Sequence, residues 1–160
     1  MASRHILVLG IGNTLLSDEG AGVHAMEYLR SCYPAIPGVH YLDGGTLSFT
    51  LAGEIEDAGN LIVIDAAQLD AAPGTVRCMT GQEMDRFLGS GKCSVHEVGL
   101  IDLMDIARLM DTFPRHRALI GIQPETTDWG DAPSPQVSKA FPEVAAHALG
   151  LIEQWADRCD

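Results

Sequence analysis

With 160 residues, 46% of them hydrophobic, the chain is long enough to bury a sizeable core, and we expect one domain over residues 1–160. Its formal net charge of −12 argues against binding to nucleic acid, whose phosphates would repel it. The sequence has no apolar run of about 18 residues, no signal-peptide pattern and no C-x-x-C pair, so we expect a cytoplasmic protein with no membrane contact.

Apolar runs alternate with stretches of helical spacing along most of the chain, which is typical of a sheet covered by helices. The expected strands are residues 5–9, 39–42, 61–64, 74–79 (an edge strand) and 118–122. The expected helices are residues 19–32, a helix capped by Thr46 that presents Leu47, Leu51 and Ile55, residues 83–88, residues 97–110, and a C-terminal helix that Pro142 separates from a short turn after Ser134-Pro135. The predicted fold class is α/β: a three-layer αβα domain with a mostly parallel sheet.

Four acids follow three consecutive predicted strands. Asp18 and Glu19 come after the first strand, Asp43 after the second and Asp65 after the third. Because the carboxyl ends of parallel strands meet at one edge of a sheet, we expect these side chains to gather there, with His96 in a loop that folds over the same edge. Carboxylates and an imidazole suit a divalent transition metal. For any single acid, capping of a helix is an equally good explanation.

Other motifs in the chain are incomplete. Gly10-Ile11-Gly12 begins a dinucleotide fingerprint, but Leu15 stands where its third glycine belongs. His96-Glu97 begins a zinc-protease helix, but Leu100 stands where the second histidine belongs. Cys93 and His96 have no matching second pair for a structural zinc site, and no G-x-S-x-G elbow occurs. We therefore interpret Gly10 and Gly12 as the turn by which the chain leaves the first strand.

Five ordered motifs extend over most of the chain. They are Gly10-Ile11-Gly12-Asn13, Asp18-Glu19-Gly20-x-Gly22, Asp43-Gly44-Gly45-Thr46, Ile64-Asp65-Ala66 and Ser94-x-His96-x-x-Gly99-Leu100, and they are followed by residues 121–125 and Ser134-Pro135. In this order and spacing the sequence resembles the nickel–iron hydrogenase maturation endopeptidases. The resemblance implies a twisted, mixed five-stranded sheet between helices.

The same resemblance implies an activity and a metal site. The activity is a single cut that removes the C-terminal extension from the precursor of the hydrogenase large subunit after nickel has been inserted. The implied metal ligands are Glu19, Asp65 and His96, and Asp43 is also implicated in function. Nickel would be carried by the substrate as a recognition element, and another divalent transition metal would fit these ligands in the isolated protein.

The catalytic step stays open at this point. Either a metal-bound hydroxide attacks the peptide bond, or a water does so that Asp18 or Asp43 activates, as in an aspartyl endopeptidase. The alternative function is a non-catalytic metal-binding chaperone of the large subunit, which would use the same ligands. The sequence does not define the oligomeric state, and a monomer is the expectation.

Four further residues are candidates for contact with the substrate. Asn13, Gly44 and Gly45 belong to the motifs, and Trp129 lies in the polar loop 123–133 after the last strand. This loop emerges at the same sheet edge as the acids and is long for such a connection. Trp129 either forms one wall of a groove for the large subunit or pins the loop to the body of the domain.

Overall fold

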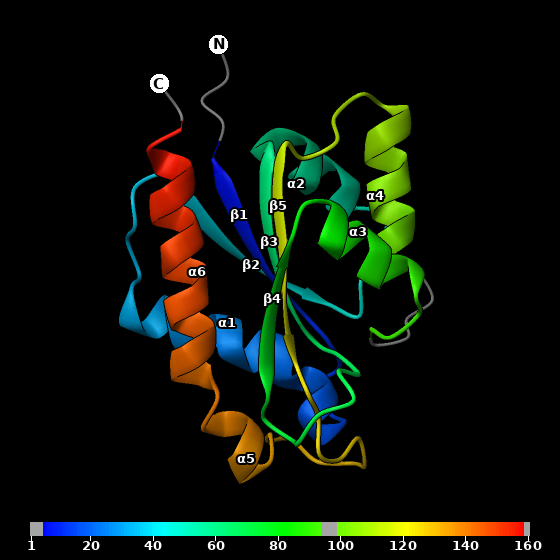
Figure 1. Cartoon of the computed structure of the whole chain (residues 1–160), viewed down its shortest axis with the longest axis vertical. Coiled ribbons are helices and arrows are strands. Elements are labelled where there is room, and N and C mark those ends of the chain that lie inside the picture. The colour runs from blue at the N-terminus through cyan, green and yellow to red at the C-terminus, as the bar shows by residue number, and fades with distance from the viewer. Residues whose placement is uncertain (1–4, 94–98, 159–160) are drawn as a thin grey trace.

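The computed structural model describes residues 5–93 and 99–158, which surround a five-stranded sheet in the order β2–β1–β3–β5–β4 (Figure 1). The strands are β1 (Ile6–Ile11), β2 (Val39–Gly45), β3 (Asn60–Ala66), β4 (Val76–Thr80) and β5 (His116–Ile122). Strands β1, β2, β3 and β5 run parallel, and β4 pairs with β5 in the antiparallel direction. The mixed, mostly parallel sheet and the edge position of β4 are confirmed.

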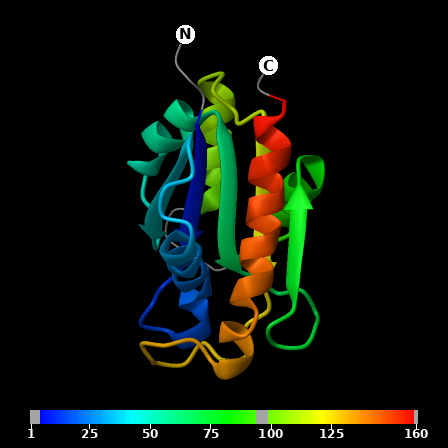
Figure 2. The ribbon, with the colours of Figure 1, turned by 90° about the vertical axis from the view of Figure 1, so that its left-hand side faces the viewer.

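Helices cover both faces of this sheet, as Figures 1 and 2 show from two directions. The helical elements are the 3₁₀ turn η1 (Ser17–Gly20), α1 (Ala21–Cys32), α2 (Leu51–Ala58), α3 (Gln82–Gly89), α4 (Leu100–Leu109), α5 (Pro135–Ser138) and α6 (Phe141–Ala156). One core joins the sheet to α1, α5 and α6, and the other joins it to α2, α3 and α4. The predicted three-layer architecture is confirmed. No helix in the described ranges has both the length and the apolar character needed to cross a membrane.

The central strands are buried along their whole length. Alternate residues of β1 and β3 point to opposite faces of the sheet and so belong to different cores. Val8 and Ile62 belong to the core with α1 and α6, and Leu7 and Leu61 belong to the core with α2 and α4. Each fully buried side chain of this kind stabilises the fold by about 1.5–3 kcal/mol. This two-sided burial explains why the sequence of β3 is continuously apolar before Asp65.

Helix α1 approaches the sheet backbone to backbone. A Cβ atom on Gly22 would lie 2.1 Å from the Ile64 carbonyl oxygen and 2.4 Å from the Ile11 carbonyl oxygen. A Cβ atom on Gly10 would lie 2.8 Å from the Met26 Cβ atom. These contacts fix the start of α1 over the carboxyl ends of β1 and β3. The interpretation of Gly10 as part of a turn is therefore wrong, because β1 continues to Ile11; only Gly12, with φ +136°, makes the turn.

The predicted start of the second helix is also wrong. The chain continues in β2 to Gly45, and a tight turn follows in which the Leu47 N–H donates to the Gly44 carbonyl oxygen at 3.0 Å. Leu47 has φ +66° and is buried in the core outside any helix, so α2 begins only at Leu51. By contrast, the separation of α5 from α6 follows the prediction, with Pro142 in the first turn of α6.

Candidate active site

Two loops far apart in the sequence lie side by side at the carboxyl edge of the sheet. In Figure 2 they are the blue segment after β1 and the orange segment before α5, at the end opposite the two termini. The Ser17 N–H donates to the Gly130 carbonyl oxygen, and the Gly130 N–H donates to the Leu15 carbonyl oxygen, each at 2.9 Å. The Asp18 N–H also donates to the Thr126 carbonyl oxygen at 3.1 Å. The first motif and the polar loop therefore form one structural unit.

Asp18 holds this unit together from within. Its carboxylate is fully buried and accepts hydrogen bonds from the N–H groups of Glu125 (2.8 Å), Thr126 (3.1 Å) and Ser134 (2.6 Å), and from the Ser134 hydroxyl (2.8 Å). Burial alone would raise the pKa of Asp18, but the hydrogen bonds outweigh it and lower the pKa below its ordinary value. A carboxylate held in this way is a weak proton acceptor, so the geometry argues against the predicted water-activating role.

Glu19, the next residue in η1, borders a cavity instead. The cavity has a volume of about 340 Å³ and lies between residues 66–68 after β3, residues 91–93, and Pro124 and Thr127 of the polar loop. Glu19 is half-buried at this cavity, whereas Asp18 is fully buried in the loop. The 3₁₀ turn thus directs two adjacent acids to different surroundings, one toward the loop and one toward open space.

Asp65 lies fully buried near the end of β3, directly before the residues that line the cavity. Cys93 also lines the cavity and forms an isolated β-bridge with Ala67, two residues after Asp65. Burial, and then the charge of Asp65, raise the pKa of the Cys93 thiol to about 12. Cys93 is therefore protonated at neutral pH and does not act as an ionised nucleophile.

The three-ligand metal site cannot be assembled from the described residues alone. His96 lies outside them, and within residues 5–93 and 99–158 no three His, Cys, Asp or Glu side chains come close enough to hold a metal ion. Glu19 and Asp65 do lie at the same edge of the sheet, one on the cavity and one just before its lining. The assignment of Glu19, Asp65 and His96 as ligands stays a prediction.

The other motif residues shape turns near this edge. The Asp43 carboxylate is exposed on β2 and accepts a hydrogen bond from the Gly45 N–H at 2.8 Å. Gly45, with φ +51°, accepts a hydrogen bond from the Gly12 N–H at 2.8 Å. Asn13 accepts one from the Leu15 N–H at 2.9 Å, and Gly44 packs directly over Leu9 and Ile11 of β1. Their predicted contacts with a substrate stay predictions.

Trp129 lies on the surface of the polar loop. Its side chain is 82% exposed, so it does not pin the loop to the domain, and that interpretation is wrong. The loop is held instead by backbone hydrogen bonds and by Asp18. Leu15, joined to this loop through the Gly130 N–H, is 58% exposed as well. Two large apolar side chains are therefore exposed to solvent on neighbouring loops.

Comparison with known proteins identifies the family to which this fold and these motifs belong. The family model of the HycI hydrogenase maturation protease matches residues 23–151. The chain belongs to the hydrogenase maturation protease family. It is 38% identical to the hydrogenase 2 maturation protease of Escherichia coli over 150 residues, which cover 93% of this chain and 91% of that protein.

Solved structures of this protease family have the same fold. The hydrogenase maturating endopeptidase HybD from E. coli superimposes with a TM-score of 0.86 at 32% sequence identity, over 94% of this chain and 93% of that one. The [NiFe] hydrogenase maturation protease HybD from Thermococcus kodakarensis superimposes with a TM-score of 0.78 at 28% identity, over 93% and 99% of the two chains. As a member of this family the chain is a peptidase.

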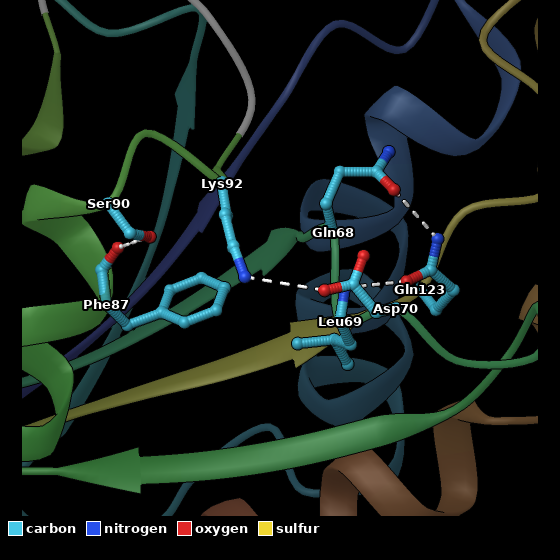
Figure 3. A network of polar contacts seen from close by, with 7 residues as sticks. All are labelled: Gln68, Leu69, Asp70, Phe87, Ser90, Lys92 and Gln123. Carbon is cyan, nitrogen blue, oxygen red and sulfur yellow. Dashed lines mark hydrogen bonds and ion pairs between the residues drawn. The ribbon is translucent and has the colours of Figure 1, made fainter.

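Two glutamines beside the cavity of this protease are missed by the sequence analysis. Gln123 is buried, and its Oε1 atom accepts the Leu69 N–H at 2.6 Å, so its Nε2 atom must be a donor. That nitrogen donates to the Oε1 atom of Gln68 at 3.0 Å, and Figure 3 shows the amide nitrogen of Gln68 pointing away from Gln123. Gln123 lies in a family motif, which is a usable signal, whereas nothing in the sequence singles out Gln68.

Proposed function

We propose that the protein is an endopeptidase that removes the C-terminal extension from the nickel-loaded precursor of a nickel–iron hydrogenase large subunit. Family membership supports the peptidase activity and the class of substrate. The observation that carries the proposal is the separation of the two adjacent acids. The Asp18 carboxylate is buried and accepts hydrogen bonds from the polar loop, whereas Glu19 borders an open cavity near the buried Asp65. This arrangement leaves Glu19 available to a substrate.

The chemistry of the donor set fits nickel that arrives with the substrate. Two carboxylates and an imidazole are ligands that divalent transition metals accept, and three protein ligands leave coordination positions for groups of the substrate itself. Glu19 lies on the cavity and Asp65 next to it, and His96 follows the cavity residue Cys93 by three positions in the sequence. In this proposal the ion on the precursor reports that maturation has reached the stage for cleavage.

The residues described near the cavity favour attack by water over attack by a side chain. The Cys93 thiol is protonated at neutral pH because its pKa is raised to about 12. Asp18 is a weak base because its carboxylate already accepts four hydrogen bonds. Of the two carboxylates proposed to activate water, Asp43 is the exposed one and therefore the better candidate.

Leu15 and Trp129 are the proposed apolar contacts for the precursor. Their exposed side chains, on loops joined by the Gly130 N–H, offer apolar surface at the carboxyl edge of the sheet. A tryptophan provides a large, rigid contact area, and contiguous exposed apolar groups mark sites of protein association. These side chains form one wall of the groove for the C-terminal region of the large subunit.

The decisive experiment compares two forms of the precursor. The nickel-loaded precursor is expected to shorten when the protein is added, and the nickel-free precursor is expected to keep its full length. Intact-mass measurement of both after incubation in chelated buffer tests this. Efficient cleavage of the nickel-free form would overturn the role of nickel. A stable complex with no shortening of either form would favour the chaperone instead.

A pair of variants tests the polar loop. Asp18→Asn should lower the free energy of unfolding by about 3 kcal/mol, because an amide presents an N–H group to donors that need an acceptor. Processing should fall with it. Trp129→Ala should leave the melting temperature unchanged, since its side chain is 82% exposed, but should weaken binding of the precursor at least several-fold.

The pH dependence of stability gives a further check on Asp18. Its pKa is lowered in the folded protein, so its contribution is complete above its ordinary pKa of 3.8 and is lost as the pH falls through the folded value. At acidic pH the free energy of unfolding should therefore fall less steeply with decreasing pH in Asp18→Asn than in the parent. The anchoring role would be contradicted if the two proteins showed the same pH dependence of the free energy of unfolding, or if Asp18→Asn were as stable as the parent.

A further inference from the structure

A second cavity adjoins the first and gathers positive charge. It has a volume of about 410 Å³ and lies between the segment after β3, strand β4, helix α3 and the residues that follow α3. Arg77, Arg86 and Lys92 line it, three of the ten lysine and arginine residues in a chain whose net charge is −12. Two acids of the described residues, Asp70 and Glu83, belong to the same lining. The described part of the lining is thus net positive on an acidic protein.

One of these cations has no ion-pair partner among the residues that the structure describes. Arg77 pairs with Glu83 at 3.0 Å and Lys92 pairs with Asp70 at 3.4 Å, whereas Arg86 makes no ion pair with any residue in the described ranges. Figure 3 shows the Lys92–Asp70 pair with the ring of Phe87 directed toward it. Among the described residues, Arg86 is therefore the unpaired cation of the cavity lining, to which Phe87 also contributes.

The wall that carries Arg86 is fixed in position. The neighbouring residue Asp85 accepts two hydrogen bonds from Arg117 of β5, at 2.9 Å and 2.7 Å, which tie α3 to the sheet. The hydrogen bonds from Arg117 are the main cause of the lowered pKa of Asp85, so this pair stays ionised at neutral pH. A two-point contact of this kind restricts both distance and orientation. Arg86 and Phe87 are thus presented by a rigid helix.

Gln68 and Lys92 line both cavities and so mark the junction between them. The amide of Gln68 has a defined orientation, because its Oε1 atom receives the Nε2–H of Gln123 at 3.0 Å. Its Nε2 atom is left as a donor that points away from Gln123 (Figure 3). A donor fixed at the junction suits the carbonyl oxygen of a polypeptide that passes from one cavity to the other.

We propose that the second cavity binds a carboxylate of the precursor's C-terminal extension, with Arg86 as its principal partner. This inference rests on the proposed function, since it assigns a position to the part of the substrate that is removed. The extension leaves the first cavity across Gln68 and reaches the cationic lining, where a guanidinium and a carboxylate form a charge-assisted contact. The positive charge of the lining attracts an acidic segment to this part of the surface.

Charge reversal at Arg86 tests the proposal. Arg86→Glu should raise the KM for the nickel-loaded precursor roughly ten-fold at low salt with kcat unchanged, because an exposed pair is lost and a repulsion of similar size replaces it. The KM of the parent should also rise with salt, and that of the variant should not. Arg86 is exposed on α3, so the melting temperature should be unaffected.

Arg158→Glu is the matched control. Arg158 follows the end of α6, which packs on the opposite face of the sheet from α3, and it is exposed. This variant makes the same change in net charge and should keep the KM of the parent. An equal rise of KM in both variants would overturn the assignment to the second cavity, as would an unchanged KM in Arg86→Glu.

Binding of a labelled synthetic peptide of the extension tests the cavity without cleavage. The parent should bind it more tightly than Arg86→Glu does, and equal affinities would overturn the inference whether or not the precursor is cut. Amidation of the peptide C-terminus and replacement of its Asp and Glu residues by Asn and Gln then distinguish a terminal from a side-chain carboxylate. Retention of affinity by a peptide with both changes would also contradict the proposal.

Discussion

Gly12→Val is expected to destabilise the protein by at least about 4 kcal/mol and to lower its melting temperature by about 10 °C. Gly12 has φ +136°, where residues with a side chain are strained, and a Cβ atom there would lie 1.9 Å from the Glu19 carbonyl oxygen. The overlap is with backbone, which cannot rotate away. Because the displaced residue is the proposed nickel ligand, processing of the precursor should be lost as well.

Gly53→Val is the matched control for this change. Gly53 lies in α2, and outside its chain neighbours and its own helix backbone no atom of the described residues lies within 4 Å of the position that its Cβ would take. Glycine is a poorer helix former than valine, so this variant should unfold at the temperature of the parent or slightly above it. Thermal unfolding of both variants, followed by circular dichroism, gives the comparison. A Gly12→Val variant as stable as Gly53→Val would show that the turn tolerates a side chain.

Asp65→Asn is expected to reduce kcat/KM for the nickel-loaded precursor at least about a hundred-fold, more than the loss of an outer-sphere partner causes in metal sites. Asparagine has the size of aspartate, so the buried position near the end of β3 should remain filled, and circular dichroism should show a folded variant. The isolated variant should also bind Ni²⁺ more weakly, which isothermal titration measures directly.

Asp105→Asn serves as the control for the loss of one negative charge. Asp105 is exposed on α4 and should show unchanged processing and unchanged Ni²⁺ binding. The ligand assignment of Asp65 fails if the Asp65→Asn variant processes the precursor at the parental rate. It fails equally if both variants bind Ni²⁺ as the parent does.

The different surroundings of Asp18 and Glu19 mark the limit of sequence reasoning in this protein. The strand ends predicted that both acids lie at the carboxyl edge, and both do. The burial of Asp18 could not be predicted, because its partners Glu125, Thr126 and Ser134 are 107 to 116 positions away in the chain. The local sequence pattern predicts at which edge of the sheet a residue lies. Its hydrogen-bond partners depend on how loops from distant parts of the chain pack together.

The errors at the element boundaries have a similar cause. Asp43-Gly44-Gly45 has the composition of a turn, yet β2 continues through it because β1 pairs with it as far as Ile11 opposite Gly45. Pairing with a neighbouring strand outweighed the local preference of glycine. The core could be predicted well, since two-sided burial produces an apolar run such as residues 61–64 that is visible without any partner.

The contact of Gly22 with the Ile11 and Ile64 carbonyl oxygens has a mechanical consequence. At Gly22 no side chain separates α1 from the strands, so the first turn of the helix cannot move toward the sheet without a collision of backbone atoms, and packed interfaces of this kind are stiff. The contact of α1 with the carboxyl ends of β1 and β3, next to Glu19 and Asp65, is therefore rigid. Any adaptation to a precursor must therefore come from the loops at the carboxyl edge of the sheet. Backbone mobility measured residue by residue should be high in these loops and low along α1.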